Sequence, residues 1–416
     1  MIKPSLVLFV FVTSGFSDNW PAWRGPHANG VCDEKNLPRQ WSATENVRWK
    51  MPLPGPGNST PIIWGDRVFL TQSLDKGGQD RALLCLDRRD GKLHWQKSVK
   101  FEGKESTHGD NPYCSASPAT DGYRVVASFG SAGVACYDFD GKQLWHRDLG
   151  KFEHIWGNAS SPVIHGDRVF LNCGPGERTF LIALDLKSGK DLWSVEEPGG
   201  KFGKDSKEWL GSWSTPVVAR INKRDELIMT WPDAIKSYNP HTGELLWTCR
   251  GLTKLAYTSP LVTPDVVVAM SGYGGSWIAC KTGGQGDVTE THRLWRNDRA
   301  PQRIGSGVIV GDHIYMVNEP GTAQCIELAT GKTLWNERLG SGSWGNLVLA
   351  EGRLYVTNLA GETGVFAAKP QFEVLAKNPL GEKTLASIAV SNGDIFIRTY
   401  QNLWCIANPN QSKGVK

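Results

Sequence analysis

The chain is organised in repeats, each holding four short runs of strand-forming residues bounded by Gly, Asp, Asn or Pro. The clearest repeat starts at Ser160 with a Ser-x-Pro motif and closes at Trp193, with a Gly-Asp turn at Gly166 and a Ser-Gly-Lys turn at Ser188. Neither alternate face of the runs is consistently polar, which is typical of sheets buried on both faces. Each repeat is therefore predicted to form a four-stranded antiparallel sheet.

A tryptophan closes each of seven repeats, and Leu375 is predicted to occupy the same position in the eighth. The closing positions are 40 to 54 residues apart, which matches one blade of a β-propeller. Stacked blades bury their faces against one another around an axis, so few strand edges stay exposed. The repeat that closes at Trp295 lacks the turn Gly but is counted as a blade. The closing tryptophans are Trp49, Trp95, Trp145, Trp193, Trp247, Trp295 and Trp335.

The two ends of the repeat region complement each other. After Leu375 the chain supplies three strand-like runs, near residues 385–390, 395–398 and 403–406, which is one strand short of a blade. Residues 46–50 carry the closing-Trp pattern without preceding strands of their own. We predict an all-β, eight-bladed propeller closed by pairing the N-terminal strand with the last three strands. A seven-bladed ring is the alternative if one weak repeat is not a blade.

The first residues are typical of an export signal. Lys3 precedes an apolar run at residues 6–12, and the small residues Gly15 and Ser17 follow just before Asp18. A buried N-terminal strand is the alternative. We expect a periplasmic or extracellular protein, with no lipidation cysteine and no transmembrane segment. The predicted divisions are a signal peptide at 1–17, an N-terminal arm at 18–45, the propeller at 46–408 and a polar C-terminal tail at 409–416.

Charge and cysteine content narrow the function classes. The net charge of +4 is spread along the chain without a Lys/Arg run, so nucleic acid is not expected as a partner. We also expect the protein to be a monomer. The cysteines number nine, an odd count, and form no CxxC pair. Five of them are predicted to fall at the same point of successive repeats, as small buried strand residues. These five are Cys85, Cys136, Cys280, Cys325 and Cys405.

A candidate site lies in the segments that lead from each closing Trp into the next innermost strand, together with the loops between second and third strands. These segments meet at one rim of the channel, whereas the Gly-Asp and Gly-Lys turns of the opposite rim are expected to be ordinary solvated turns. Aromatic walls with a few polar groups suit a small ligand or a partner peptide. The alternative is a structural plug. The candidate rim residues are His108, Asp110, Asn111, His154, Trp156, Asn158, Trp213, Tyr257, Arg303, Trp344 and Asn346.

Enzyme motifs are sparse in the chain. Residues 340–345 satisfy GxGxxG by letter, but no helix follows that could present its amides to a pyrophosphate. HExxH, GxSxG and P-loop patterns are absent from the sequence, and the nine histidines lack metal-ligand spacing. We therefore predict no catalytic residue and no metal site.

The Gly-Lys-x-Leu-Trp ending carries a family resemblance over residues 46–408. It stands at Gly141–Trp145, Gly189–Trp193 and Gly331–Trp335, with His in the Leu position at Gly91–Trp95 and Glu in the Lys position at Gly243–Trp247. The repeat resembles the pyrroloquinoline-quinone (PQQ) repeat family, found in quinoprotein dehydrogenases and in BamB-type outer-membrane assembly proteins. WD40 repeats match poorly because their Gly-His and Trp-Asp pairs are missing.

The resemblance implies two different functions. The BamB-type likeness implies a binding or scaffolding module that holds an unidentified envelope protein or a small ligand. The dehydrogenase likeness implies PQQ and Ca²⁺ on the channel axis and a carboxylate base, for which Asp110 is the best candidate. The sequence has no adjacent Cys pair, and its lead-in segments offer mainly Ser, Thr and Asn. We therefore expect the binding module without a cofactor, with the PQQ- and Ca²⁺-dependent alcohol dehydrogenase as the alternative.

Overall fold

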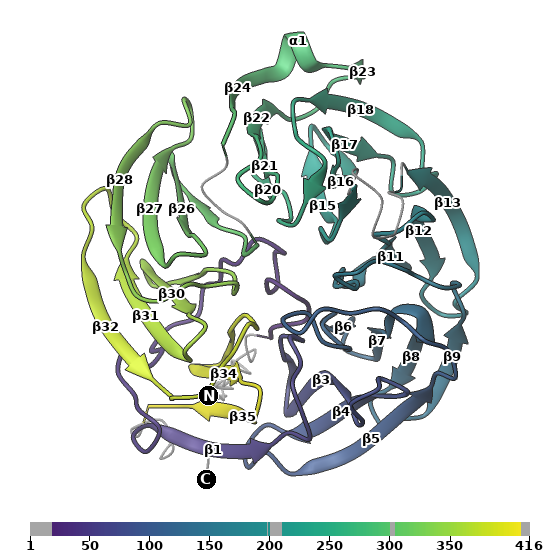
Figure 1. The fold of residues 1–416 in the computed structure, drawn as a ribbon, viewed down its shortest axis with the longest axis vertical. Coiled ribbons are helices and arrows are strands. Elements are labelled where there is room, and N and C mark those ends of the chain that lie inside the picture. The colour runs from purple at the N-terminus through teal and green to yellow at the C-terminus, as the bar shows by residue number, and fades with distance from the viewer. Residues whose placement is uncertain (1–18, 198, 200–209, 300–303, 409–416) are drawn as a thin grey trace, which may run out of the picture.

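Eight antiparallel β-sheets stand as blades around a central channel in the computed structural model (Figure 1). The structure describes residues 19–197, 199, 210–299 and 304–408. The predicted signal peptide at 1–17 and the predicted tail at 409–416 lie outside these residues. The all-β, eight-bladed prediction is confirmed. No helix within the described residues has the length and apolar character needed to cross a membrane.

Each blade places its first strand against the channel and its last strand at the periphery. Blades one to four comprise β2 (Ile62–Trp64), β3 (Arg67–Ser73), β4 (Asp80–Asp87) and β5 (Leu93–Lys100); β6 (Ala119–Thr120), β7 (Arg124–Ser128), β8 (Val134–Asp138) and β9 (Gln143–Arg147); β10 (Val163–His165), β11 (Arg168–Cys173), β12 (Thr179–Asp185) and β13 (Asp191–Glu197); β15 (Val217–Ile221), β16 (Arg224–Trp231), β17 (Ala234–Tyr238) and β18 (Leu245–Arg250).

Blades five to eight repeat the arrangement. They comprise β20 (Leu261–Val262), β21 (Val266–Met270), β22 (Trp277–Lys281) and β24 (Arg293–Asn297); β25 (Val308–Val310), β26 (His313–Val317), β27 (Thr322–Glu327) and β28 (Thr333–Arg338); β29 (Val348–Ala350), β30 (Arg353–Thr357), β31 (Glu362–Ala367) and β32 (Val374–Pro379); β33 (Ala389–Ser391), β34 (Asp394–Arg398), β35 (Asn402–Ile406) and β1 (Val47–Pro52). Outside this scheme lie a 3-10 helix (Gly130–Ala132), α1 (Thr289–His292), β23 (Gly286–Asp287), and a short parallel pair, β14 (Gly211–Ser212) with β19 (Leu255–Ala256).

The ring closes as the sequence predicts. Strand β1 pairs antiparallel with β35, and Trp49 lies opposite Cys405 (Figure 1). The N-terminal strand thus supplies the outer strand of the last blade. Because the first strand and the last strands of the ring share one sheet, opening the ring requires the loss of all the hydrogen bonds between β1 and β35.

The closing tryptophans join neighbouring blades. The indole N–H of Trp95, for example, donates to the Phe139 carbonyl oxygen of the next blade at 2.9 Å. A Cβ added to Gly141 would lie 2.8 Å from the Trp95 ring, so only glycine fits under that ring. The Gly-Lys turns are therefore not merely solvated turns, because each glycine forms a platform for the preceding blade. Matching indole bonds run from Trp49 to Arg88, Trp145 to Leu186, Trp193 to Pro240 and Trp295 to Leu328.

Blade five departs from this scheme because its turn has no such glycine. Trp247 of the preceding blade instead donates its indole N–H to the Glu226 carboxylate at 2.7 Å. Strand β23 pairs with β18 beside it, and α1 projects with β23 at the outer edge of the ring (Figure 1). The insertion thereby covers Trp247, which is fully buried. The degenerate repeat is thus a blade with an added outer segment.

The closing position of blade seven is Ala376 rather than the predicted Leu375. In every blade the third and fourth strands shift register just before the closing residue, as in Cys85 opposite Trp95 and Val365 opposite Ala376. Leu375 is the extra residue at this β-bulge. The paired residues Val365 and Ala376 are 11 positions apart, whereas Cys325 and Trp335 in the preceding blade are 10 apart, so a spacing carried over from that blade misplaces the position by one.

The predicted equivalence of the five cysteines is wrong for Cys280. Ala279 lies opposite Trp295, whereas Cys280 pairs with Arg293. Successive strand residues point to opposite faces, so the side chain of Cys280 points to the other face of its blade. All nine cysteines lie in the described residues, are buried, and form no disulfide.

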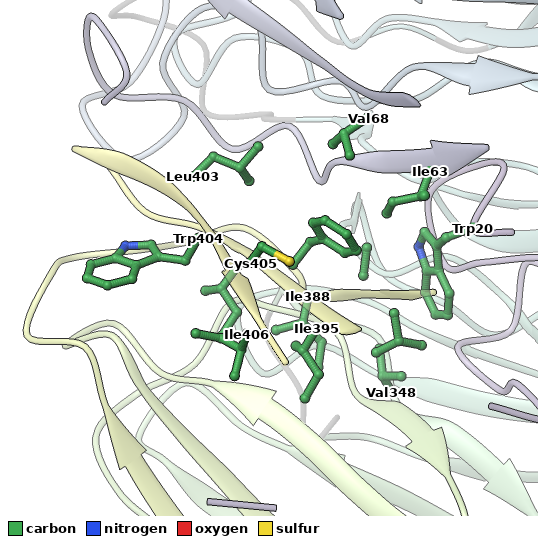
Figure 2. Packing of buried hydrophobic residues seen from close by; sticks show 14 of the residues in the cluster. Trp20, Ile63, Val68, Val348, Ile388, Ile395, Leu403, Trp404, Cys405 and Ile406 are labelled. Atoms are coloured by element: carbon green, nitrogen blue, oxygen red, sulfur yellow. The ribbon is translucent and has the colours of Figure 1, made fainter. Parts of the chain in front are cut away.

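The N-terminal arm crosses the ring instead of extending away from it. Trp20 bridges to Ile63 in blade one, and the Cys32 amide donates to the Leu349 carbonyl oxygen in blade seven at 3.1 Å. In Figure 1 this purple segment crosses the centre of the ring. Figure 2 shows Trp20 beside Ile63 and Val348, within the core that joins the last blade to the first. The arm therefore ties distant blades together across the channel.

Candidate functional site

One cavity, of about 340 Å³, lies at the channel rim formed by the lead-in segments. Each of the eight blades contributes to it, and Trp23 contributes from the arm. Because the arm crosses the channel below, the cavity has a floor. The lining residues are Trp23, Asn58, His108, Asp110, Asn111, Ser115, Trp156, Ala159, Ser161, Trp213, Thr215, Tyr257, Tyr273, Ile304, Glu319, Trp344, Asn346, Leu385 and Ser387.

The structure brings most of the predicted rim residues together around this cavity. His154 and Asn158 do not line it, and both lie behind its surface. Arg303 lies outside the described residues. The predicted residues that line it are His108, Asp110, Asn111, Trp156, Trp213, Tyr257, Trp344 and Asn346.

A series of side-chain hydrogen bonds, running from blade one to blade eight, holds the lead-in segments at fixed positions. In successive blades, the residue that precedes the innermost strand accepts a bond from the backbone N–H of its counterpart one blade earlier. The Ser117 amide, for example, donates to Ser161 Oγ at 3.0 Å, and the Ser161 amide donates to Thr215 Oγ1 at 3.0 Å. The series runs through Thr60, Ser117, Ser161, Thr215, Ser259, Ser306, Asn346 and Ser387. The residue directly before the proline of the repeat start, such as Ser161 after Ser160, is therefore a link between blades.

Four aromatic side chains from blades three to five form one side of the cavity, which we name the aromatic wall: Trp156, Trp213, Tyr257 and Tyr273. Their ring centroids are 4.8 Å apart for Trp213 and Tyr257 and 5.5 Å apart for Trp156 and Tyr273. Tyr273 has a left-handed backbone with φ of 52°, which is unusual for a residue with a side chain. A Cβ on Gly272 would lie 2.0 Å from Tyr257, so this glycine permits the close approach.

His154 supports the aromatic wall from behind. Its ring is buried and packs edge-on against Trp213 at 4.9 Å, and its Nδ1 accepts a hydrogen bond from the Trp156 amide at 3.2 Å. Burial lowers the pKa of His154 to about 4, so the ring is neutral near neutral pH. Trp213 is fixed further by its indole N–H, which donates to the Gly157 carbonyl oxygen at 2.8 Å. His154 is thus a positioning residue of the wall.

Asn158 acts on the segment that carries the predicted His108, Asp110 and Asn111. Its amide donates to Glu105 Oε1 at 2.6 Å, and Glu105 forms a buried ion pair with Arg81 at 2.5 Å. Arg81 in turn lies over the ring of Tyr113 at 4.7 Å. This buried network holds the segment between blades one and two against the blades. Asn158 therefore shapes the cavity without lining it.

Amide and carboxylate groups line the rest of the cavity, beginning directly beside the aromatic wall. Asn111 Nδ2 donates to the Trp156 carbonyl oxygen at 2.6 Å, and Asn58 Nδ2 donates to the Asp110 carbonyl oxygen at 2.9 Å. The Asp110 carboxylate pairs with Lys383 of blade eight at 2.8 Å. These bonds connect segments far apart in the chain, so the polar groups are fixed before any ligand arrives.

Some lining residues had no usable signal in the sequence. Trp23 belongs to the arm, and no local pattern indicates that the arm enters the channel. Tyr273 and Glu319 lie in loops between second and third strands, and neither is among the candidate rim residues of the sequence. The Ser-Gly-Tyr-Gly-Gly run at residues 271–275 was the available signal for Tyr273, because flanking glycines often mark a strained turn.

Comparison with known proteins decides the family. The family model described as outer membrane protein assembly factor BamB matches residues 34–205, 79–337 and 182–413 in overlapping copies. The chain belongs to this PQQ-repeat family. The overlapping matches follow from the repeats, since one model can be placed at several blade positions.

Relatives of this PQQ-repeat chain include enzymes and assembly proteins. A polyvinylalcohol dehydrogenase of a Pseudomonas species is 25% identical over 269 residues, which is 55% of this chain and 40% of that protein. The chain thus matches less than half the length of that dehydrogenase. The BamB protein of Moranella endobia is 21% identical over 345 residues, covering 78% of this chain and 82% of the relative.

Solved structures show the same fold at low identity. BamB from Moraxella catarrhalis superposes with a TM-score of 0.59 at 15% identity, covering 83% of this chain and 93% of that one. A europium-containing methanol dehydrogenase superposes with a TM-score of 0.67 at 11% identity, covering 92% and 90%. At such identities the likeness concerns the propeller alone.

The described residues of the cavity do not fit PQQ with Ca²⁺. PQQ is a polycarboxylate, yet no Lys or Arg is among the described residues that line the cavity. Ca²⁺ takes several oxygen ligands, and within the described ranges no group of three or more His, Cys, Asp or Glu side chains converges. Asp110, the carboxylate assigned to the enzyme alternative, is already paired with Lys383.

Proposed function

We propose that this PQQ-repeat protein is a binding module whose ligand occupies the floored cavity at the channel rim. The observation that carries the proposal is the cavity itself, to which every blade contributes and which combines an aromatic wall with fixed amides. Side chains that are already held by hydrogen bonds lose little freedom when a ligand binds, which favours affinity.

The proposal includes export of the chain. The apolar run at residues 6–12, after Lys3 and before Gly15 and Ser17, supports cleavage near Asp18 and release into the periplasm or the medium. Fractionation of expressing cells followed by N-terminal sequencing tests this step. A mature chain that begins near Asp18 is expected, and an intact Met1 in the cytoplasm contradicts it.

A small ligand is the first candidate occupant, and an envelope protein is the second. The BamB relatives are outer membrane protein assembly factors by name, which supports a protein partner at the same rim. The cavity favours the small ligand because it is concave and lies below the rim. A partner protein would insert a side chain or loop into the cavity, against the aromatic wall and Asn111.

The experiment compares two tryptophan variants. Trp156→Ala removes part of the aromatic wall, whereas Trp64→Ala removes an equally half-buried indole at the opposite rim. Thermal shift measurements with a library of neutral, cationic and anionic small molecules are run on the wild type and both variants. Compounds that stabilise the wild type and Trp64→Ala but not Trp156→Ala support the proposal. Stabilisation that is equal in all three, or absent from all, overturns it.

The second candidate function is oxidation of an alcohol with PQQ and Ca²⁺, favoured by the match to polyvinylalcohol dehydrogenase. Titration of the purified chain with PQQ and Ca²⁺, followed by absorbance and dye-coupled alcohol oxidation, tests it. From the charge of the described lining residues we expect no binding at micromolar cofactor. Tight binding with turnover would replace the binding-module proposal.

A further inference from the structure

The cavity is lined by aromatic rings and by polar amides, so a matching ligand needs both an apolar and a polar surface. The aromatic wall offers ring faces and edges, while Asn58, Asn111 and Asn346 provide amides on the remaining perimeter. The Nδ2 donors of Asn111 are taken by the carbonyl oxygens of Trp156 and Asn158, so this residue offers its amide oxygen as the acceptor for a ligand hydroxyl. A matching ligand is apolar on one face and carries hydroxyl groups around its edge.

The charges of the site disfavour an anionic ligand. The carboxylates of Asp110 and Glu319 line the cavity, and the described lining residues include no Lys or Arg. The ammonium of Lys383 already pairs with Asp110 at 2.8 Å. A buried anion needs an opposite charge or several donors to replace its hydration.

The geometry of the aromatic wall disfavours a quaternary ammonium ligand. A cation is bound when aromatic rings surround it on several sides. Here the rings contact one another, with centroids 4.8 Å apart for Trp213 and Tyr257 and 5.7 Å apart for Tyr257 and Tyr273. The four rings therefore form one continuous surface and leave no space between them for a cation.

We infer that the cavity binds a neutral saccharide, with the C–H face of one sugar ring against the aromatic wall and its hydroxyls toward the amides. The inference rests on the proposed binding function and names its ligand class. Tyr273, whose side chain is about half exposed, stands at the open edge of the wall. It is the residue that a second sugar unit would meet as the chain leaves the cavity.

Contacts behind the aromatic wall also hold its rings in place for stacking against a sugar. His154 holds Trp156 and Trp213 from behind, and the Trp213 indole is fixed on Gly157. Sugars bind weakly to mobile groups because their hydroxyls are well solvated, so a fixed set of partners matters. In this site both the stacking surface and the amide Asn111 are fixed by bonds within the protein.

Isothermal titration calorimetry with cellobiose, N,N′-diacetylchitobiose and xylobiose tests the inference on the full mature chain. Tetramethylammonium and citrate serve as cationic and anionic probes at the same concentrations. We expect saturable heat with at least one disaccharide and none with either ion. Removing a stacked ring by Trp156→Ala or Tyr273→Ala should weaken the disaccharide roughly tenfold, which is about 1.4 kcal/mol.

Two controls keep the outcomes distinct. Trp64→Ala should bind as the wild type does, and Trp156→Phe should retain part of the affinity because it keeps an aromatic face. Tyr273→Ala alters a half-exposed side chain, so it reports on the wall even if Trp156→Ala fails to fold. Binding of tetramethylammonium or citrate that depends on Trp156, without disaccharide binding, overturns the saccharide and leaves the binding module standing. Binding of none of the probes, with no library compound sensitive to Trp156→Ala, overturns both.

Discussion

The indole N–H of Trp95 reaches across the space between two blades and donates to the carbonyl oxygen of Phe139 at 2.9 Å. Beneath the same ring lies Gly141, the glycine of the next blade's Gly-Lys turn. The motif that defines the repeat in the sequence is thus a contact between consecutive repeats. The glycine of the motif contacts the preceding blade and its tryptophan contacts the next blade, which explains why the blades stack in a fixed order.

Replacement of Gly141 by alanine should destabilise the ring through this contact. The added Cβ would meet the Trp95 ring at 2.8 Å, and the backbone φ of 82° is itself costly for alanine. We expect a loss of about 2 to 4 kcal/mol in the free energy of unfolding, measured by denaturant titration. Gly166→Ala is the matched control, since its φ is 59° and no atom lies within 4 Å. Equal losses in both variants would show that the turn backbone alone accounts for the cost.

The stability of the protein should fall on acidification because of His154. Folded, the buried ring has its pKa lowered to about 4, while the unfolded chain takes up the proton near 6.5. Between these values the unfolded state binds more protons, so stability decreases as the pH falls from 6.5 towards 4. The slope contributed is about 1.4 kcal/mol for each pH unit.

His154→Asn isolates this contribution. The asparagine carbonyl can still accept the Trp156 amide but does not titrate. Free energies of unfolding measured from pH 7 to pH 4 should fall less steeply for the variant than for the wild type. The surface variant His241→Asn serves as the control, and a slope that His154→Asn leaves unchanged would contradict the assignment.

The buried pair of Arg81 and Glu105 should control the shape of the cavity. Glu105→Gln leaves the Arg81 charge buried without its partner, at a cost of about 3 to 5 kcal/mol. The segment at 101–118 should then become sensitive to limited proteolysis, and saccharide affinity should drop with it. The double variant Arg81→Met with Glu105→Leu removes both charges and should recover much of the stability. Resistance of that segment in Glu105→Gln would argue against its anchoring role.

The arm should be essential to the stability of the ring. Trp20 is almost fully buried among Ile63 and Val348, so Trp20→Ala leaves a cavity and should cost about 3 to 5 kcal/mol. The melting temperature by circular dichroism measures the effect, and the floor of the cavity should loosen with it. Tyr123→Ala, at a side chain that is 79% exposed, should leave the melting temperature unchanged. A Trp20→Ala protein that melts with the wild type would place the arm outside the folding unit.

Several site residues could be placed from the sequence because the repeat defines the two rims. Once the start of each innermost strand was located, His108, Trp156 and Trp344 followed as members of one rim. The role of His154 could not be read in this way, because a histidine two positions before Trp156 can line a cavity or support it. Only the packing of neighbouring blades decides between these positions.

The sequence by itself determined the eight blades, their order and the closing strand, because each depends on local signals that recur at a nearly constant spacing. The tertiary structure decided what those signals do between blades: the Gly-Lys turn under Trp95, the displaced closing position at Ala376, and the arm that places Trp23 under the cavity. These features depend on contacts between residues far apart in the chain and on a strand connection that is one residue longer in blade seven than in blade six. A repeat pattern gives the spacing of residues within one blade, whereas contacts with the neighbouring blades determine the final position of each side chain.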